Sequence, residues 1–409
     1  MKNMLNIQDQ YKFPMGQLIY EQEPDAEVTF RMYNRNKDTR IASLVSAEEL
    51  QDYYDDLRQL SFTPEEISIL EKQTDKNYTK DFLGYLAVFR LPEISVSIDP
   101  NNNDLTAQTT ASWNKSSLWE IPMLSALPEL YYPRYIESQG STVDEVWNEG
   151  DRRLDDMINL IQQHPDLRFA EFGTRRRFSS KWQDHAVERF VTECPDQLLG
   201  TSNPWLADKY SIPAVGTNAH ELGMVYAALK EQRGENPLDG QNAVIADWLD
   251  RFPAMPVVLT DTFTTDATLR GMNQEQVEQV KSYRIDSGNE YDIGEKIIDF
   301  LKMHKIDPTT RSLFFSNSLT IQKAAQLHEH FHGRIGVAFG IGGGAVNNLG
   351  FNENSNLPSM NIVSKAIAVN GEGTVKLSDD PGKCMGKAVD IARYQELAET
   401  YQHEVADAA

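Results

Sequence analysis

The chain has 409 residues, of which 40% are hydrophobic, and its 39 basic and 61 acidic side chains give a net charge of −22. This length exceeds one typical core and predicts two domains, while the acidic excess argues against a nucleic-acid surface. The N-terminus does not resemble a signal peptide, and no apolar stretch approaches the roughly 18 residues of a membrane span, so we expect a cytoplasmic protein that binds neither membrane nor nucleic acid.

The first 133 residues are expected to form an α+β domain. Apolar spacing predicts helices at 11–21, 46–58 and 64–73, and alternation predicts a strand at 27–33. Two further strands, at 93–98 and 105–112, are expected to pair across the turn-rich residues 99–104.

From residue 134 to 370 the pattern changes to short strands that alternate with helices. After a helical region that begins at 120 and a long helix at 143–163, the expected strands are 167–172, 257–262, 282–285, 312–315 and 334–339. The expected helices between them are 186–194, 274–280, 293–303 and 320–331. This alternation predicts an α/β domain with a parallel sheet, either open or closed into a barrel.

The C-terminal segment, 371–409, is expected to pack on one of these domains. Strands are predicted at 361–369 and 374–377, and a helix from 387 that ends in a disordered tail. The two cysteines, Cys194 and Cys384, are far apart in sequence and are expected to be reduced thiols.

Three motifs in the middle of the chain indicate an anion-binding active site. Phe172-Gly-Thr-Arg-Arg-Arg-Phe-Ser179 ends a predicted strand, and Gly200-Thr-Ser-Asn203 and Gly216-Thr-Asn-Ala-His-Glu221 follow it. Guanidinium groups match carboxylate and phosphate oxygens as a planar fork, which suits such a site.

Taken together, these motifs resemble those of the nicotinate phosphoribosyltransferase family of bacterial type. Further matches occur in the same order at 9–15, 259–262, 284–288, 339–342 and 376–383. The resemblance implies an irregular α/β barrel like that of type II phosphoribosyltransferases, joined to an N-terminal α+β domain. It also implies a reaction in which nicotinate displaces pyrophosphate from phosphoribosyl pyrophosphate. The expected cofactors are Mg²⁺ and ATP, whose hydrolysis would be coupled to the reaction.

The same resemblance assigns roles to individual residues. His220 would be phosphorylated by ATP, with Glu221 orienting it, and Asp286 would act in catalysis. Phe172 would stack on one face of the pyridine ring and Tyr11 on the other, reaching in from a second subunit of a homodimer with a shared active site. The remaining expected substrate contacts are Arg175, Arg176, Ser202, Asn203, Asp261, Arg284, Gly342, Gly343 and Gly344.

Structural roles compete with several of these assignments. Tyr11 and Phe172 could be core aromatics, Asp261 and Asp286 could cap helices, and one or more of the three consecutive arginines could brace neighbouring groups. His328, His330 and His332 lack the pattern of a zinc site, and no protein-held metal is expected.

The sequence departs from the usual family pattern at three places. Asn317 and Thr320 stand where the family more often has aspartate, Asn289 replaces another aspartate, and Gly342 is followed by two more glycines. Because Asn289 and the glycine run are features of nicotinamide-specific relatives, a nicotinamide-preferring enzyme is one alternative. A catalytically silent phosphoribosyl-binding or nucleotide-binding regulator is the other.

Overall fold

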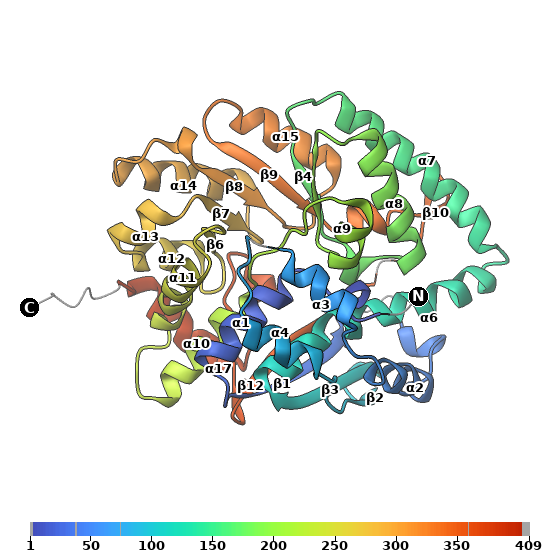
Figure 1. The fold of residues 1–409 in the computed structure, drawn as a ribbon, viewed down its shortest axis with the longest axis horizontal. Helices are drawn as coiled ribbons and strands as arrows, with labels where there is room; N and C mark the ends of the chain where they lie inside the picture. Colours follow the sequence, from blue (N-terminus) through green and yellow to red (C-terminus); the bar gives the residue numbers. More distant parts are fainter. Residues whose placement is uncertain (1–2, 37–38, 74, 359, 403–409) are drawn as a thin grey trace, which may run out of the picture.

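The structure is a computed structural model that describes residues 3–36, 39–73, 75–358 and 360–402. It contains an antiparallel sheet, in the lower half of Figure 1, and a parallel sheet, in the upper half. One continuous cluster of buried hydrophobic side chains runs through both halves. The expected combination of a parallel α/β part with an N-terminal α+β part is confirmed.

The antiparallel sheet has the strand order β13-β12-β1-β3-β2. Its strands are β1 (Glu27–Asn34), β2 (Ser95–Asp99), β3 (Asp104–Ser112), β12 (Ile362–Val369) and β13 (Glu372–Gly373). Buried residues alternate along β1, as the period of two predicts for a strand with one face on the core. The expected hairpin of β2 and β3 is present.

The strand β12 arrives from the far end of the chain and pairs with β1. It therefore lies in the N-terminal sheet although its residues fall inside the segment 134–370, and the proposed domain limits stay a prediction. The strand expected at 374–377 is wrong, because Lys376 makes only an isolated bridge to Met385.

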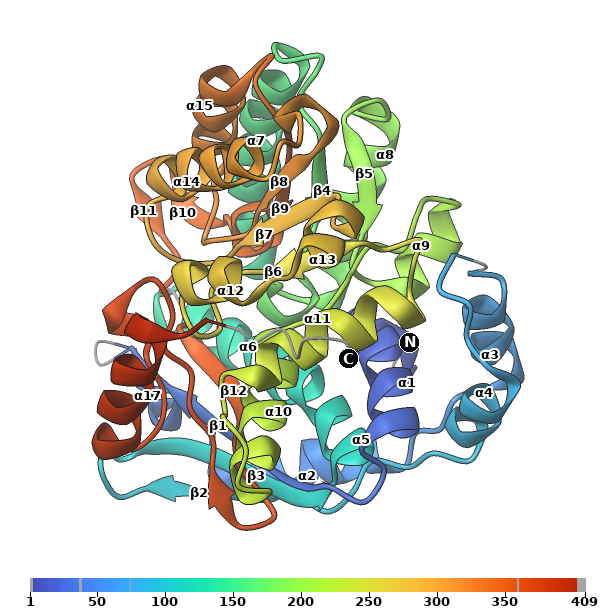
Figure 2. The same cartoon turned by 90° about the vertical axis from the view of Figure 1, so that its left-hand side faces the viewer.

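A first group of helices packs around the antiparallel sheet and between the two sheets (Figures 1 and 2). These helices are α1 (Lys12–Gln22), α2 (Ala47–Arg58), α3 (Pro64–Glu71), α4 (Lys80–Ala87), α5 (Trp113–Ser116), α6 (Glu120–Ser138), α10 (His220–Gln232), α11 (Asp239–Arg251) and α17 (Ala388–Thr400). Residues 403–409, the end of the expected C-terminal tail, lie outside the described residues.

The parallel sheet has the strand order β5-β4-β9-β8-β7-β6. Its strands are β4 (Phe169–Glu171), β5 (Leu198–Thr201), β6 (Val257–Leu259), β7 (Ser282–Ile285), β8 (Ser312–Phe315) and β9 (Gly336–Ile341). No ladder joins the edge strands β5 and β6 within the described ranges, so the barrel is incomplete, in keeping with an irregular barrel.

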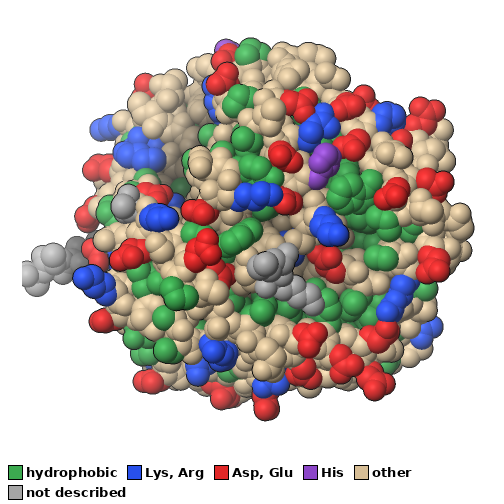
Figure 3. All heavy atoms as spheres, turned by 45° about the vertical axis from the view of Figure 1, so that its right-hand side comes forward, with side chains coloured by type: hydrophobic (Ala, Val, Ile, Leu, Met, Phe, Trp, Pro, Cys, Tyr) green, Lys and Arg blue, Asp and Glu red, His purple; other side chains and the backbone are tan. Residues whose placement is uncertain are grey.

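The helices that accompany this sheet occupy the upper half of Figure 2. They are α7 (Val143–Gln162), α8 (Ser180–Glu193), α9 (Pro204–Tyr210), α12 (Thr265–Gly271), α13 (Gln274–Gln279), α14 (Glu290–Met303), α15 (Ile321–Phe331) and the single turn α16 (Gly343–Val346), which precedes the short hairpin β10 (Gly350–Asn352) and β11 (Ser355–Asn356). Among all described helices, none combines the length and the apolar composition that crossing a bilayer requires. On the face in Figure 3, acidic and basic side chains are interspersed.

Local sequence signals explain why several helices begin where they do. The side chains of Ser46, Thr63 and Thr142 each cap a helix by accepting from the backbone N–H of the glutamate three residues later. In return, the backbone N–H of each cap residue donates to the side chain of that glutamate. By contrast, α10 has no side-chain cap, and its residues from His220 to Leu229 are all buried. A helix that is buried on every side shows no amphipathic period, so the sequence pattern did not predict it.

Lys12 in α1 is fully buried and lies between two carboxylates. Its Nζ is 2.6 Å from Glu120 Oε2, at the start of α6, and 2.6 Å from Glu221 Oε2, in α10. Trp113 Nε1 donates a hydrogen bond of 2.7 Å to Glu221 Oε1. Burial alone would lower the pKa of Lys12, but the two carboxylates outweigh it and the pKa is raised. One ammonium group therefore fixes three helices to each other.

Replacing this lysine tests how much the buried network stabilises the fold. We expect Lys12→Met to lower the free energy of unfolding by roughly 3–5 kcal/mol, because two carboxylates lose their shared counter-charge without access to water. Urea unfolding followed by tryptophan fluorescence would measure the loss.

The matched control is Arg152→Met, which removes surface ion pairs with Glu149 and Asp156 and should leave the free energy of unfolding nearly unchanged. Equal, small losses for both variants would show that Lys12 does not hold the helices together.

Candidate active site

The loops that follow the parallel strands carry the polar groups of the predicted site. The carboxyl ends of parallel strands meet at one edge of a sheet, where α/β proteins bind their ligands. A small cavity lies between this edge and the antiparallel sheet. The ionisable side chains that line it include Glu120, Arg175, His220, Arg284, Asp286 and Lys365.

His220 is the first residue of α10 and is 6% exposed. Its Nδ1 lies 3.2 Å from Thr262 Oγ1, and its Nε2 lies 3.1 Å from Asp286 Oδ2 and 3.7 Å from Asp261 Oδ1. Burial and the nearby charge of Lys376 lower the pKa of His220 to about 4, against the opposing effect of the two aspartates. The imidazole is therefore neutral near physiological pH.

The two aspartates differ in how their oxygens are bound. Asp261 is fully buried; Ser287 donates to its Oδ2, while its Oδ1 has no hydrogen-bond partner. Asp286 accepts a bond of 2.8 Å from Ser316 Oγ. Burial would raise the pKa of Asp286, but its hydrogen bond with His220 and the charge of nearby Arg284 hold it well below its usual value.

Neither aspartate caps a helix, so the competing structural role is wrong for both. Thr264 caps α12, and Asn289 caps α14. Asp261 instead lies two residues after the end of β6, Asp286 directly follows β7, and both lie within 4 Å of the imidazole of His220.

The arginines of the first motif separate into three environments. Arg175 lies in the cavity, with Nη1 3.2 Å from Glu120 Oε1. Arg176 donates to the backbone oxygen of Ile362 at 2.9 Å. Arg177 is buried and donates to the backbone oxygen of Asn6 and to Gln183 Oε1. Arg177 therefore holds the N-terminal segment in place. This is the structural role that we expected for at least one of the three consecutive arginines.

Arg284 extends from β7 into the cavity. Its Nη1 donates to the backbone oxygen of Asn218 at 2.7 Å, and its Nε donates to Ser316 Oγ at 3.0 Å. Among the described residues, one carboxylate lies within 4.0 Å of its guanidinium, that of Asp286, with Oδ1 3.9 Å from Nη2. Its guanidinium is consequently oriented by neutral groups and retains charge for an anion.

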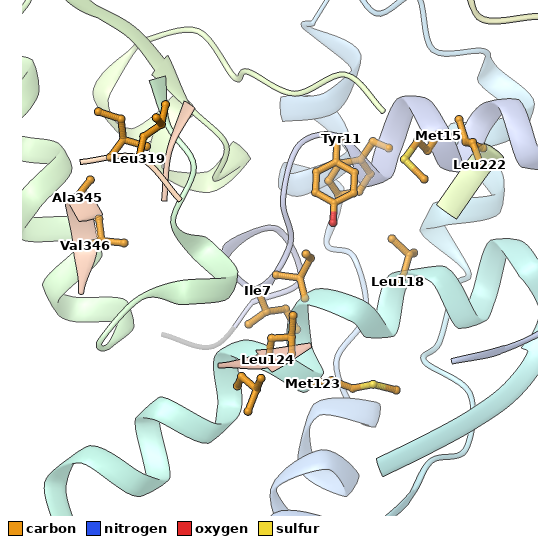
Figure 4. Packing of buried hydrophobic residues seen from close by; sticks show 14 of the residues in the cluster. Ile7, Tyr11, Met15, Leu118, Met123, Leu124, Leu222, Leu319, Ala345 and Val346 are labelled. Atoms are coloured by element: carbon orange, nitrogen blue, oxygen red, sulfur yellow. The ribbon is translucent and has the colours of Figure 1, made fainter. Parts of the chain in front are cut away.

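Tyr11 occupies the cavity of its own chain. Its hydroxyl donates to Glu120 Oε2 at 2.9 Å and accepts a long bond of 3.5 Å from Arg175. Figure 4 shows the ring at the start of α1, in the same buried cluster as Leu222. The expectation that Tyr11 reaches in from a second subunit is wrong for this structure, and the reason for a shared active site is lost with it.

Phe172 lies at the end of β4 and packs on Phe314, with ring centroids 5.4 Å apart. In the described part of the chain, its ring makes no direct contact with the ring of Tyr11. The two aromatics are thus placed by different elements, and the stacking role of each stays a prediction.

Glu221 does not orient His220. One carboxylate oxygen binds Lys12 and the other accepts from Trp113, so both are occupied away from the imidazole. The catalytic role expected for Glu221 is corrected to a structural one, since Thr262 and Asp286 are the partners of His220.

The residues of the second motif, 200–203, are buried beside the site. Ser202 Oγ donates to Asp9 Oδ1 at 2.5 Å, and Asn203 is fully buried and caps α9 with its side-chain oxygen. Neither residue lines the cavity, so this geometry does not favour direct contact with a substrate.

The glycine run after β9 allows close backbone approach. A Cβ on Gly344 would lie 2.6 Å from the backbone oxygen of Leu319, and one on Gly342 would lie 3.0 Å from that of Phe172. The run leads into α16 and the hairpin β10–β11, not into the helix and parallel strand of a dinucleotide site. A phosphate cradle at Gly342 to Gly344 stays a prediction.

Two lysines near the site were not predicted from the sequence. Lys365 is on β12, and burial lowers its pKa to about 8 although Glu120 opposes this effect. Lys376 lies 3.6 Å from Asp261 Oδ2. Both come from the C-terminal part of the chain, and no local pattern indicated that Lys365 faces the site, because the buried residues of β12 do not alternate.

The histidines of α15 were a further candidate site. His328 and His332 share a face, with ring centroids 5.6 Å apart, while His330 pairs with Glu295. Within the described ranges, no group of three or more His, Cys, Asp or Glu side chains is arranged to hold a metal ion.

The fold is that of an α/β protein whose cavity places cationic side chains and a neutral histidine at the carboxyl ends of a parallel sheet. Residues 7–128 match the profile of the nicotinate phosphoribosyltransferase (NAPRTase) N-terminal domain, and residues 167–405 match that of the nicotinate phosphoribosyltransferase (NAPRTase) family. The chain belongs to this family.

Individual relatives are similar over nearly their whole length. A nicotinate phosphoribosyltransferase of Acinetobacter baumannii is 33% identical over 413 residues, which covers 98% of this chain and 97% of the relative. The crystal structure of a nicotinate phosphoribosyltransferase from Porphyromonas gingivalis superposes with a TM-score of 0.87 at 26% identity, covering 98% of this chain and 100% of that one. One from Vibrio cholerae gives 0.85 at 28% identity, covering 97% and 94%.

The protonation state of His220 can be measured directly. We expect its imidazole signal, followed by NMR on histidine-labelled protein, to stay unchanged from about pH 8 to about pH 5 and to move only near pH 4. Because the folded pKa lies below the unfolded value of 6.5, the neutral imidazole stabilises the fold above pH 6.5, and this contribution is lost as the pH falls toward 4.

Comparison with His220→Gln would identify the signal among those of the 8 histidines. A midpoint at or above 6.5 would instead mean that the two aspartates hold an imidazolium.

Proposed function

We propose that the protein is a nicotinate phosphoribosyltransferase of NAD salvage, which forms nicotinate mononucleotide and pyrophosphate from nicotinate and phosphoribosyl pyrophosphate. The observation that carries this proposal is the cavity itself, where Arg175 and Arg284 meet a neutral His220 and the ionised Asp286. Membership of the family supports the choice of reaction.

The guanidinium of Arg175 is proposed to bind the carboxylate of nicotinate. It is the arginine of the first motif that lines the cavity, and Glu120 beneath it also has Lys12 as a partner, so Arg175 can turn to a ligand. Tyr11 in the same cavity offers an aromatic face, and such contacts add on the order of 1 kcal/mol beyond burial.

Asp286 and Asp261 are proposed to serve the cation-like ribose of the transition state. A fixed carboxylate stabilises developing positive charge most effectively where water is excluded. The unpartnered Oδ1 of buried Asp261 also fits Mg²⁺, which binds through one or two carboxylates together with substrate phosphates. Mg²⁺ would offset the charge of the leaving pyrophosphate; Asp261 and Asp286 would hold it.

His220 is proposed to accept a phosphoryl group from ATP. In the resting site Nε2–H donates to the ionised Asp286, and Nδ1 accepts from Thr262 Oγ1. A change of tautomer, which moves the proton to Nδ1, frees the Nε2 lone pair for attack. Attack of Nε2 on the γ-phosphorus forms the N–P bond, breaks the bond to the bridging oxygen, and releases ADP with that electron pair. A neutral imidazole, which the lowered pKa ensures, is the required nucleophile.

The cytoplasm is the location we propose for the enzyme, and a homodimer remains a proposal that no longer depends on Tyr11.

Nicotinamide preference is the rival specificity, since Asn289 and the glycine run at 342–344 are shared with nicotinamide-specific relatives. The guanidinium of Arg175 in the cavity favours the carboxylate substrate.

A base-selectivity assay tests the proposed reaction. With phosphoribosyl pyrophosphate and Mg²⁺, we expect mononucleotide formation from nicotinate that rises with ATP, and in His220→Ala we expect the ATP-dependent rise to disappear because no nucleophile remains. Product can be quantified by chromatography.

Turnover with nicotinamide alone would establish the rival specificity. Binding without turnover of either base would indicate the silent regulator instead.

The role of Arg175 is tested by neutralising it. We expect Arg175→Gln to lower kcat/KM for nicotinate by roughly 10- to 100-fold, because a charge-assisted bond to the carboxylate is lost. Initial rates at saturating phosphoribosyl pyrophosphate give this ratio. Arg152→Gln, on the exposed face of α7, should leave it unchanged. An equal loss of kcat/KM in both variants would show that Arg175 does not bind the carboxylate of nicotinate.

A further inference from the structure

Thr262, whose hydroxyl lies 3.2 Å from Nδ1 of His220, is held from two sides. Its side chain is buried against α10, where a Cβ on Gly223 would lie 2.9 Å from Thr262 Cγ2. Its backbone oxygen accepts from the N–H of Leu377 at 2.9 Å and from that of Ser378 at 3.4 Å. These two residues belong to the connection between β13 and α17. The position of the hydroxyl beside the imidazole therefore depends on a segment more than 100 residues later in the chain.

The turn that follows Thr262 is strained. Thr264 has a φ of +78°, in the left-handed region that a β-branched side chain rarely adopts. Such a backbone conformation persists only where surrounding contacts hold it. One of these contacts is the cap of α12, in which Thr264 Oγ1 accepts from the N–H of Ala267 at 3.2 Å. The next residue, Thr265, makes the other contacts.

Asp379 binds Thr265 with both of its carboxylate oxygens. Its Oδ1 accepts from the backbone N–H of Thr265 at 2.7 Å, and its Oδ2 accepts from Thr265 Oγ1 at 2.5 Å. The N–H of Asp379 in turn donates to Ser287 Oγ at 3.1 Å. Gly288, with a φ of +79°, leaves room for this side chain, because a Cβ there would lie 3.0 Å from Asp379 Cβ. One side chain thus fixes the strained turn to the segment that also binds the backbone of Thr262.

We propose that Asp379 is a positioning residue for His220. By holding Thr265 it keeps the strained turn in place and the Thr262 hydroxyl on Nδ1, with Nε2 beside Asp286. A hydroxyl can donate as well as accept, so its bond with Nδ1 persists whichever ring nitrogen carries the proton. The contact therefore orients the imidazole through the change of tautomer that attack by Nε2 requires.

This inference deepens the proposed function, because phosphoryl transfer to His220 belongs to that function. The orientation of the imidazole, however, can be measured in the absence of any substrate. The two can therefore fail separately.

The experiment is a double-mutant cycle read out on the Nδ1 signal of His220, by nitrogen NMR on histidine-labelled protein near neutral pH. Thr262→Val removes the hydroxyl and gives the signal of an imidazole without this bond. Asp379→Asn retains one acceptor oxygen in place of two, so one bond to Thr265 is lost and the signal should move by about half of that difference or more. In the Thr262→Val background, Asp379→Asn should cause no further shift, since the contact it maintains is already gone.

The same loss should appear in the reaction with ATP. We expect the initial rate at which His220 takes up acid-labile phosphate to fall roughly tenfold in Asp379→Asn, because a misplaced nucleophile reacts more slowly. The KM for ATP should be nearly retained, which a general loss of structure would not produce.

Asp380→Asn is the matched control, since it removes the same charge from the neighbouring residue. Asp380 accepts from the N–H of Gly382 at 2.9 Å, a bond that asparagine can also accept, so the His220 signal should stay unchanged. Thr265→Ser is the conservative variant. It keeps both donors to Asp379 and should retain the wild-type signal.

Three results would overturn the proposal: an unchanged signal in Asp379→Asn beside a changed one in Thr262→Val, an equal shift in Asp380→Asn, or a full further shift in the Thr262→Val background. If Asp379→Asn does not fold, Thr265→Val carries the same expectation, because it removes one of the two bonds and keeps the other. A wild-type protein that takes up no phosphate from ATP would count against the proposed function and leave the NMR cycle valid.

Discussion

The ion network around Lys12 is the constraint on which the rest of the structure depends. Two carboxylates and one ammonium group are removed from water, and such groups are tolerated only when their geometry is complete. Glu120 and Glu221 come from helices far apart in sequence, so the network can close only when α1, α6 and α10 are all in place. The active site is built on this network, since His220 follows Ala219 into α10 directly before Glu221, and Arg175 lies on Glu120.

The same network sets the electrostatics of the cavity. In a protein with a net charge of −22, an anionic substrate is attracted only where acidic groups are already paired. Glu120 has Lys12 and Arg175, and Asp286 has Arg284 and Ser316. His220 adds no charge because burial keeps it neutral. The cationic side chains of the cavity and its neutral imidazole are therefore consequences of one arrangement of buried groups.

The sequence predicted those parts of the structure that local chemistry determines. The reciprocal caps at Ser46, Thr63 and Thr142 and the alternation in β1 needed no tertiary information. The helix α10 could not be found this way, because tertiary burial on every side removes the periodic signal. Likewise, nothing local indicates that β12 pairs with β1, more than 300 residues earlier in the chain.

The site was predicted by its motifs and not by its contacts. Motifs identified His220, Asp286, Arg175 and Arg284, all of which the fold brings to one cavity. They could not show that Glu221 faces Lys12, because neighbouring residues on a helix point in different directions. The different roles of Arg175 and Arg177 also depend on which groups surround each side chain, and only the tertiary structure determines those groups.

Lys12 and Lys383 show how one residue type serves opposite purposes in this fold. Lys12 has two carboxylates within 2.6 Å, so its charge is used up within the protein and stabilises it. Lys383, in the connection between β13 and α17, is held by the side-chain amide of Asn317 and a backbone oxygen, which orient an ammonium group without neutralising it. Because a neutral partner stabilises less than a carboxylate does, the fold gives up stability at position 317 and keeps a positive charge beside the site.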